Sequence, residues 1–320
     1  MIDPTGRVLD YLRVSLIDRC NLRCVYCMPA EGVFWKPHAE ILRLEETLKL
    51  CEILCGLGIR KIKLTGGEPL IRKNMPYFVR RLRQAPNLQQ ITMTSNAHLL
   101  PGFLDSLGSE AADLVAGLNI SLNALEDDVY ARLTRRGDLS EALLGLKMAV
   151  ESGIPVKINC VPIKNANQDL VALARLAERE VKAVRFIELM PMGVASDLEG
   201  MSMEEVRRAL EESLGPLTRD HARLGNGPAQ YYSVPGFQGK IGFISALSEA
   251  FCSQCNRLRL GADGRLKACL ASDVSVDLRE LLRAGAGQAA IEEAILDLAA
   301  RKPVAHRFAR GRHSEGDSES

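Results

Sequence analysis

The sequence lacks a long hydrophobic run, because it contains no stretch of about eighteen consecutive apolar residues, the length that a membrane-spanning helix needs. It also lacks an excess of charge of one sign: 41 Lys and Arg against 40 Asp and Glu leave a net charge of +1. A protein whose whole surface binds nucleic acid or an anionic membrane is therefore not expected. No basic segment followed by an apolar run opens the chain, which predicts a cytoplasmic protein.

A complete disulfide framework is also not expected. The nine cysteines are an odd number spread over 320 residues, and no secretion signal accompanies them, so a metal or redox role is favoured. Six of the nine fall into two tight groups. Hydrophobic residues make up 47% of the chain, enough for a sizeable core, and the length favours about two domains.

Short β-rich runs alternate with helical patterns over the first two thirds of the chain, which predicts βα units around a parallel sheet. We expect an α/β fold, an incomplete (βα)6 TIM-like barrel, with its chemistry at the C-terminal ends of the strands. Gly58 and Gly153 each follow a predicted helix and precede a predicted strand, where a left-handed C-cap is common. The predicted strands are 12–16, 61–64, 90–94, 117–122, 156–161 and 184–189, and the predicted helices are 44–57, 75–83, 101–107, 139–151, 170–178 and 203–214.

The pattern of turn-forming residues changes after residue 214, where Gly-Pro and Pro-Gly pairs become frequent. We expect a barrel domain over 1–214, a smaller domain over 215–302 that carries the second cysteine group, and a mobile tail over 303–320. The second region is predicted to contain a short strand over 242–245 and helices over 278–283 and 289–300.

The first cysteine group, Cys20, Cys24 and Cys27, has the spacing C-x3-C-x2-C directly after the first predicted strand. Three thiolates on one short loop can bind three corners of an iron–sulfur cube, and one iron is then left without a protein ligand. A structural zinc site is the alternative, but it normally needs a fourth ligand. Plain thiols are the remaining possibility.

The setting of this group, Arg19 to Pro29, resembles the radical S-adenosylmethionine superfamily. The segment Thr65-Gly66-Gly67-Glu68-Pro69 follows the second predicted strand, where that superfamily carries its GGE motif. Glycines allow close backbone approach, and Glu68 offers an acceptor for an ammonium group. The resemblance implies that S-adenosylmethionine chelates the open iron and that an electron from the cluster releases a 5'-deoxyadenosyl radical.

The second cysteine group, Cys252, Cys255 and Cys269, again supplies three thiolates, and no histidine lies between His221 and His306. A second cluster with an open iron is favoured over a zinc site completed from elsewhere. Arg257 and Arg259 stand between these cysteines at i, i+2, which places both on one side of an extended segment, and guanidinium groups suit phosphate oxygens. No G-x4-G-K-[ST] loop is present to hold a nucleotide instead.

The two cysteine groups, the TGGEP segment and C-x2-C-N-R-L-R-x9-C together resemble the GTP 3',8-cyclase family, also called molybdenum cofactor biosynthesis protein A. The likeness runs from about Leu12 to about Cys269. It implies two 4Fe-4S clusters, S-adenosylmethionine, an electron donor and a homodimer. It further implies that the ribose 3' hydrogen of GTP is abstracted, that the resulting carbon radical attacks guanine C8, and that reduction by one electron with uptake of a proton yields (8S)-3',8-cyclo-7,8-dihydroguanosine 5'-triphosphate. This is the first step of molybdenum cofactor biosynthesis.

Site residues follow from the same resemblance, position by position. The metal ligands are Cys20, Cys24, Cys27, Cys252, Cys255 and Cys269; the S-adenosylmethionine positions are Tyr26, Gly67, Ser121 and Met190; the GTP positions are Arg13, Lys63, Thr94, Lys157, Arg257, Leu258 and Arg259, with Lys61 and Arg185 as neighbours. Cations on several strands of one barrel independently indicate an anion inside it, because buried lysine and arginine are rare unless paired.

Some positions depart from the family pattern. Lys63 stands where arginine is usual, Asn123 replaces an aspartate, Ala97 replaces a glycine, and the end of the sequence lacks the usual Gly-Gly dipeptide. A radical S-adenosylmethionine maturase acting on a peptide or another nucleotide is the alternative function. A cysteine–metal regulatory protein without turnover is a third possibility.

Overall fold

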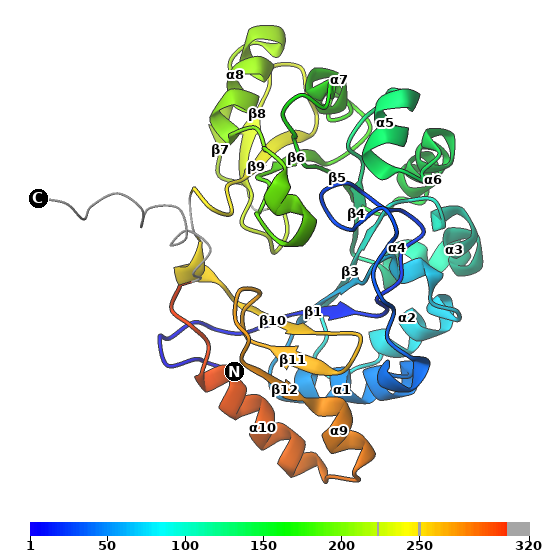
Figure 1. The fold of residues 1–320 in the computed structure, drawn as a ribbon, viewed down its shortest axis with the longest axis vertical. Coiled ribbons are helices and arrows are strands. Elements are labelled where there is room, and N and C mark those ends of the chain that lie inside the picture. Colours follow the sequence, from blue (N-terminus) through cyan, green and yellow to red (C-terminus); the bar gives the residue numbers. More distant parts are fainter. Residues whose placement is uncertain (223, 249–250, 306–320) are drawn as a thin grey trace, which may run out of the picture.

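The computed structural model describes residues 1–222, 224–248 and 251–305. Its centre is one twelve-stranded sheet in the order β12-β11-β10-β1-β2-β3-β4-β5-β6-β9-β8-β7. Figure 1 shows this sheet curving into an open arc, with helices on its outer side. None of the helices in the described ranges is long and apolar enough to cross a membrane.

The six predicted strands form the middle of the sheet and run parallel in chain order. Their ends differ from the predicted ones by one or two residues. They are β1 (Tyr11–Ser15), β2 (Lys61–Thr65), β3 (Gln90–Ser95), β4 (Gly117–Ser121), β5 (Val156–Cys160) and β6 (Ala183–Ile187).

Helices connect these strands and cover the outer face. Gly58 and Gly153 have φ of 107° and 77°, which confirms the predicted left-handed helix ends. The helices of this half are α1 (Leu44–Gly56), α2 (Met75–Arg83), α3 (Leu100–Leu107), α4 (Ala111–Leu114), α5 (Asp127–Thr134), α6 (Leu139–Glu151), α7 (Leu170–Arg175) and α8 (Met203–Leu214). The sequence did not predict α4 and α5.

The region after residue 214 adds strands to both edges of the arc. β9 (Lys240–Ile244) pairs parallel with β6, and β8 (Gln230–Ser233) and β7 (Thr218–Asp220) follow antiparallel. At the other edge β10 (Arg257–Leu260) pairs parallel with β1, followed by antiparallel β11 (Arg265–Lys267) and β12 (Ser275–Asp277). The division at 214/215 stays a prediction.

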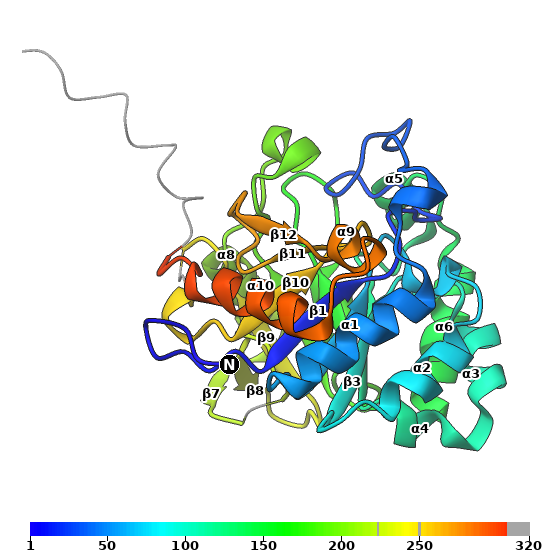
Figure 2. The same cartoon turned by 90° about the horizontal axis from the view of Figure 1, so that it is seen from below.

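Two helices close the described chain, α9 (Leu278–Arg283) and α10 (Gln288–Ala300). Figure 2 shows α10 lying alongside α1 beneath the β10–β12 edge. The predicted mobile tail begins with residues 303–305, which are described, whereas residues 306–320 and the end of the chain lie outside the described ranges.

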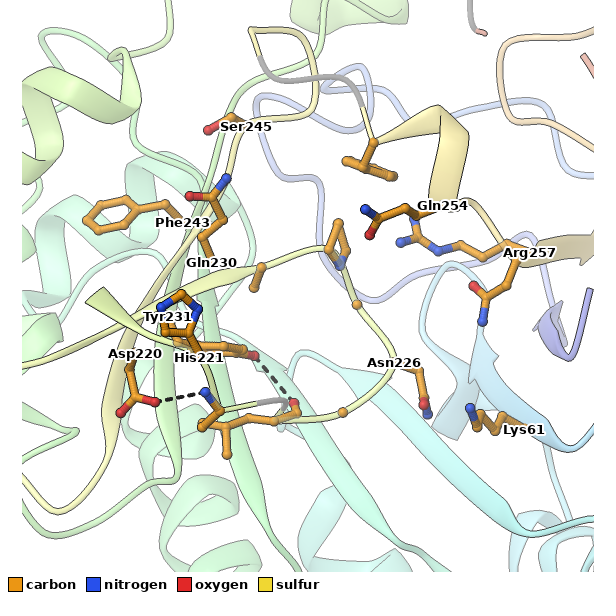
Figure 3. A pocket seen from close by; sticks show the side chains of 18 of the residues that line it. Lys61, Asp220, His221, Asn226, Gln230, Tyr231, Phe243, Ser245, Gln254 and Arg257 are labelled. Carbon is orange, nitrogen blue, oxygen red and sulfur yellow. Dashed lines mark hydrogen bonds between the residues drawn. The ribbon is translucent and has the colours of Figure 1, made fainter. Parts of the chain in front are cut away.

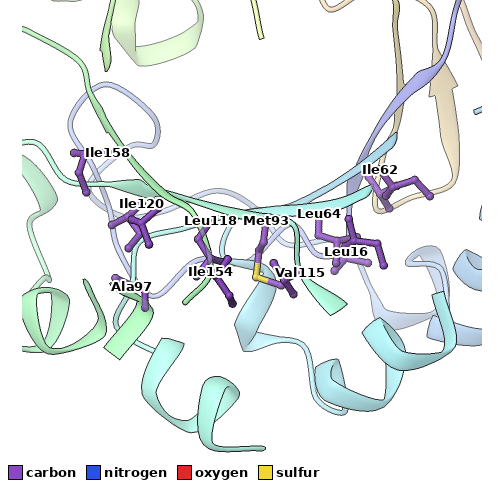
Figure 4. Close-up of a cluster of buried hydrophobic side chains, with 14 of the residues drawn as sticks. Leu16, Ile62, Leu64, Met93, Ala97, Val115, Leu118, Ile120, Ile154 and Ile158 are labelled. Carbon is purple, nitrogen blue, oxygen red and sulfur yellow. The ribbon is translucent and has the colours of Figure 1, made fainter. Parts of the chain in front are cut away.

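Alternation along the strands separates a hydrophobic face from a polar one. Leu12, Ile62 and Met93 are fully buried, and Figure 4 shows Ile62, Met93 and their neighbours on the helix side of the sheet. Because successive side chains in a strand point to opposite faces, Arg13, Lys63 and Thr92 lie on the inner face. The core therefore sits between sheet and helices, and the inner face is left for a ligand.

Candidate active site between two cysteine groups

The first cysteine group lies at the C-terminal end of β1, as predicted. The thiols of Cys20, Cys24 and Cys27 interact electrostatically with one another. Burial, together with Cys27 and Cys20, raises the pKa of Cys24 to about 12, so this thiol needs a cation nearby to ionise. Within the described residues no disulfide joins any of the nine cysteines. Cys51, Cys55 and Cys160 are fully buried, as expected of small apolar residues.

The described residues contain no group of three His, Cys, Asp or Glu side chains placed to bind one metal ion. A single structural zinc ion needs its ligands to converge on one point. The cysteines of a four-iron cube bind different irons, so they can be close enough to interact without converging. Three cysteines on one loop, close enough to interact with one another, therefore fit three corners of such a cube.

The TGGEP segment packs directly against the first cysteine group. Gly67 N donates to Ile17 O at 2.8 Å, and Glu68 N donates to Arg19 O at 2.9 Å. A Cβ at Gly67 would lie 2.1 Å from Arg19 O and 2.9 Å from Cys20 N. The glycine is therefore required here by the chain's own backbone, whatever ligand also approaches it.

The Glu68 carboxylate accepts three hydrogen bonds from the protein, which leaves about one of its four acceptor positions for an ammonium group. It is 1% exposed, and its oxygens accept from Leu70 N, Ser95 Oγ and Asn96 N at 3.2, 3.0 and 2.8 Å. Burial raises its pKa to about 7, against the effect of these hydrogen bonds. The Asn96 side chain in turn donates to Asn21 Oδ1 at 2.8 Å, so Glu68 ties the ends of β2 and β3 to the cysteine loop.

Tyr26, Ser121 and Met190 also lie at this end of the sheet. Ser121 is the last residue of β4, whereas Met190 lies in the loop after β6, because that strand ends at Ile187 rather than Leu189. The Tyr26 hydroxyl accepts from Asn123 Nδ2 at 2.9 Å, and Asn123 Oδ1 accepts from Val161 N at 2.9 Å. An amide can donate and accept at once, which gives the departure at Asn123 a structural role that the sequence did not reveal.

The departure at Ala97 has a backbone consequence. Ala97 has φ of 75°, a left-handed conformation in which alanine is strained by about 1 kcal/mol relative to glycine. Its side chain is fully buried, and burial of a methyl group returns about 0.8 kcal/mol. The two effects nearly cancel, which explains why alanine is tolerated beside Asn96.

The second cysteine group lies at the opposite end of the strands, contrary to the expectation that all the chemistry gathers at the C-terminal ends. Cys252 and Cys255 precede β10, which runs parallel to β1, and Cys269 follows the antiparallel β11. Five residues of β1 separate the two ends, a span of roughly 13 Å. The two groups thus lie at the two ends of the inner face.

Positive side chains occupy the inner face between the cysteine groups. The register places Arg13 beside both Arg259 and Lys63, Asn119 beside Lys157, and Asn159 beside Arg185. We call the following six side chains the inner cations: Arg13, Lys63, Lys157, Arg185, Arg257 and Arg259. Within the described ranges none of them forms an ion pair with a carboxylate, whereas Lys61 is paired with Asp10 at 3.0 Å.

The inner cations are destabilised by burial and by one another. Burial, followed by Arg185, Arg13, Lys157 and Arg257, lowers the pKa of Lys63 well below its ordinary value. Burial and Arg185 lower the pKa of Lys157 to about 8, and burial with Arg13 and Arg257 lowers that of Arg259 to about 10. A polyanion would relieve this repulsion.

Several buried polar atoms on this face have no hydrogen-bond partner: Arg185 Nε, Arg257 Nε and Asn159 Oδ1. Such atoms are uncommon in folded proteins and call for a ligand or water.

The two other predicted GTP positions differ in how far their side chains are exposed to the inner face. Thr94 is half-buried on the inner face, whereas the Leu258 side chain is fully buried in the core, so only the Leu258 backbone can face a ligand.

A cavity of about 1130 Å³ adjoins the inner cations. Figure 3 shows it between Gln230, Tyr231 and Phe243 on one side and Arg257 on the other, with Lys61 and Asn226 at its margin. Arg257 lines the cavity and also belongs to the inner cations, and Tyr231 interacts with Arg185. The cavity and the inner face are therefore continuous.

Comparison with known proteins decides the family. The Radical SAM superfamily matches residues 14–177, and Molybdenum Cofactor Synthesis C matches residues 182–308. A protein of Petrotoga mobilis named GTP 3',8-cyclase is 44% identical over 316 residues, 96% of this chain and 95% of that protein. The chain belongs to the GTP 3',8-cyclase family of the radical S-adenosylmethionine superfamily.

A second member of this family, from Pelotomaculum thermopropionicum, is also 44% identical, over 97% of this chain and 96% of its own length. Among solved structures, SuiB of Streptococcus suis bound to the precursor peptide SuiA has a TM-score of 0.63 at 14% identity, covering 93% of this chain and 66% of that chain. This likeness shows the fold alone. The α/β fold with a radical S-adenosylmethionine half is thus confirmed.

Sequence reasoning missed two charged residues beside the second cysteine group. Arg7 and Lys302 are 8% and 6% exposed, and both donate to backbone carbonyls around that group. Neither residue belongs to a recognisable motif, and each lies in a polar segment near one end of the sequence. Only the folded arrangement brings them to the site.

Proposed function

We propose that this protein cyclises GTP to (8S)-3',8-cyclo-7,8-dihydroguanosine 5'-triphosphate, the first step of molybdenum cofactor biosynthesis. Its family membership supports the reaction. The observation that carries the proposal is the set of six inner cations between two cysteine groups, which have no carboxylate partner among the residues that the structure describes. A triphosphate supplies the missing negative charge.

The proposal assigns one 4Fe-4S cluster to each cysteine group. Cys20, Cys24 and Cys27 hold the first, beside Tyr26, Gly67, Ser121 and Met190 as the S-adenosylmethionine positions. When bound, this cluster and S-adenosylmethionine supply the radical that takes the ribose 3' hydrogen. Cys252, Cys255 and Cys269 hold the second, next to the guanine.

The chain's own residues bind and orient the nucleotide. Arg13, Lys63 and Lys157 contact the phosphates with Arg257 and Arg259, and Thr94 and the Leu258 backbone supply hydrogen bonds. Because the cations are fixed on neighbouring strands, they hold ribose and base in one orientation, and fixed geometry rather than general base catalysis accelerates the reaction. The proposal also includes an external electron donor, and a homodimer by family resemblance.

The product tests this function most simply. Anaerobic incubation of the reconstituted protein with GTP, S-adenosylmethionine and a reductant should yield a nucleotide that has the same mass as GTP but separates from it by chromatography, together with 5'-deoxyadenosine. ATP in place of GTP serves as the control and should give no cyclised nucleotide. Formation of 5'-deoxyadenosine with unchanged GTP would contradict the proposal.

Removal of either inner cation that lies between Cys255 and Cys269 should weaken GTP binding. Arg257→Ala and Arg259→Ala each remove a charge-assisted contact worth about 1–3 kcal/mol. The dissociation constant measured by calorimetry should rise about 5- to 150-fold. Arg265→Ala, which removes an exposed guanidinium from the adjacent β11, should change it little. Unchanged affinity in both Arg257→Ala and Arg259→Ala would remove these residues from the site.

GTP affinity should also fall as the pH rises. The Lys157 pKa lies near 8 in the free protein, so its ammonium is mostly protonated at pH 7.5 and mostly neutral at pH 9. GTP binds the protonated form, so above this pKa each binding event must take up one proton. The affinity therefore falls by at most about tenfold for each unit that the pH rises. Calorimetry from pH 7.5 to 9 measures the slope. Lys157→Met should bind more weakly with a shallower slope, and constant affinity in the unaltered protein would refute the assignment.

A further inference from the structure

Lys302 is a buried lysine that follows α10. Its side chain is 6% exposed, and its ammonium donates to Arg257 O at 2.8 Å and to Ala268 O at 2.5 Å. Within the described part of the chain it forms no ion pair with a carboxylate. A buried charge is costly unless an opposite charge compensates it, and the two carbonyls are neutral.

The position of this ammonium follows from the strand register. The β10–β11 ladder pairs Leu260 with Leu266 and Arg259 with Lys267, and it stops there. If it continued, Arg257 would face Cys269. Beyond this point the two strands separate, and Lys302 bridges the gap, because one of its carbonyl partners belongs to β10 and the other to the segment after β11. It thereby fixes the distance between the strand that follows Cys255 and the segment that carries Cys269.

Within the described residues, two cysteines supply the opposite charge that faces Lys302. Burial lowers the pKa of Lys302; Cys255 and Cys269 oppose this effect, whereas Arg7 and Arg259 add to it. Both thiols must be ionised to bind iron. The buried ammonium is therefore matched by thiolates rather than by a carboxylate.

Arg7 makes the corresponding contact to Cys252, the remaining cysteine of the group. Its guanidinium donates to Cys252 O at 2.8 Å and to Pro303 O at 2.9 Å. Asp3 Oδ2 accepts from Arg7 at 2.6 Å and orients the guanidinium. One residue near the start of the chain thus joins the first cysteine of the group to the segment that begins with Lys302.

We propose that Arg7 and Lys302 are positioning residues for the second cluster. They hold the backbone at or within two residues of Cys252, Cys255 and Cys269. Lys302 also places a positive charge beside the thiolates, whereas the charge of Arg7 is paired with Asp3. This inference rests on the second cluster of the proposed function. It implies that Lys302 raises the reduction potential of that cluster, because nearby positive charge favours its reduced form, and that Arg7 keeps the charge of Asp3 neutralised.

The test uses the full chain with Cys20→Ser, Cys24→Ser and Cys27→Ser, which leaves only the second cysteine group to bind iron. On this background Lys302→Gln, Lys302→Arg and Arg7→Gln are compared after anaerobic reconstitution. Arg301→Gln, which removes an exposed charge one residue away, is the matched control. The measurements are iron per chain, the rate of cluster loss to a chelator, and the midpoint potential from redox titration followed by EPR.

The background chain should hold about four irons. Lys302→Gln and Arg7→Gln should each lose the cluster at least about tenfold faster and shift the potential to a more negative value. Lys302→Arg should restore most of the potential, and Arg301→Gln should change neither quantity. Two different cations are tested, and thermal unfolding of the iron-free chains identifies any variant that does not fold.

Two results overturn the inference in different ways. If the background chain holds a cluster whose chelator half-life and potential are the same with Lys302→Gln and Arg7→Gln, then the cations do not position it, although the second cluster stands. If the background chain takes up no iron or sulfide, then the second cluster of the proposed function is absent, and the inference fails with it.

Discussion

Cys269→Ala should abolish GTP cyclisation while leaving cleavage of S-adenosylmethionine, whereas Cys20→Ala should abolish both. The two cysteines belong to groups at opposite ends of the inner face, roughly 13 Å apart along β1. Even an outer-shell partner of a metal site costs about 10- to 100-fold when it is removed, so loss of a ligand should cost more. Chromatographic assay of 5'-deoxyadenosine and of the nucleotide product separates the two reactions.

Cys160→Ala is the matched control for these variants. Its thiol is fully buried on β5 and belongs to neither group, so both reactions should continue at the rates of the unaltered protein. Full cyclisation by Cys269→Ala would show that the second group is dispensable, and product formation by Cys20→Ala would remove the first group from the chemistry.

Gly67→Ala should destabilise the fold and prevent assembly of the first cluster. The new Cβ would lie 2.1 Å from Arg19 O and 2.4 Å from Arg19 C, so the backbone must shift at the residue that precedes Cys20. Overpacking of this kind costs about 1–3 kcal/mol, and we expect the upper part of that range because both contacting atoms belong to the backbone. Denaturant unfolding measures the free energy, and iron analysis measures the cluster.

Gly56→Ala provides the comparison within the same chain. Gly56 is the last residue of α1, and an added Cβ there meets nothing within 4 Å, so the free energy of unfolding should rise by about 0.5–1 kcal/mol. If Gly67→Ala unfolded like the unaltered protein and retained its iron, close packing of the TGGEP segment on the cysteine loop would not be the reason for this glycine.

The sequence predicted the repeating half of the fold well because the repeat makes its pattern strong. Strands β2 and β3 alternate apolar and polar side chains, and α6 and α8 have the predicted bounds. It did not predict β10, because Arg257 to Leu260 is a short run whose place beside β1 is set by tertiary pairing alone. For the same reason it placed all the chemistry at one end of the strands.

The candidate site divides in the same way. Cys20 and Arg259 stand in motifs, so spacing and resemblance could find them. Lys302 and Asn123 could not be found, because the role of each depends on partners far away in the chain: Arg257 and Ala268 for one, Tyr26 for the other. Glu68 was found as an acceptor, but the sequence could not show that three protein donors also bind its oxygens.

Transfer of deuterium from labelled GTP tests the central claim most directly, because the claim places the ribose of GTP toward the first cysteine group and the guanine toward the second. With GTP deuterated at the 3' position, mass spectrometry should find the label in 5'-deoxyadenosine. With GTP deuterated at C8, the label should stay in the nucleotide product. Absence of deuterium from 5'-deoxyadenosine in the first experiment, or its appearance there in the second, would contradict this placement of the substrate.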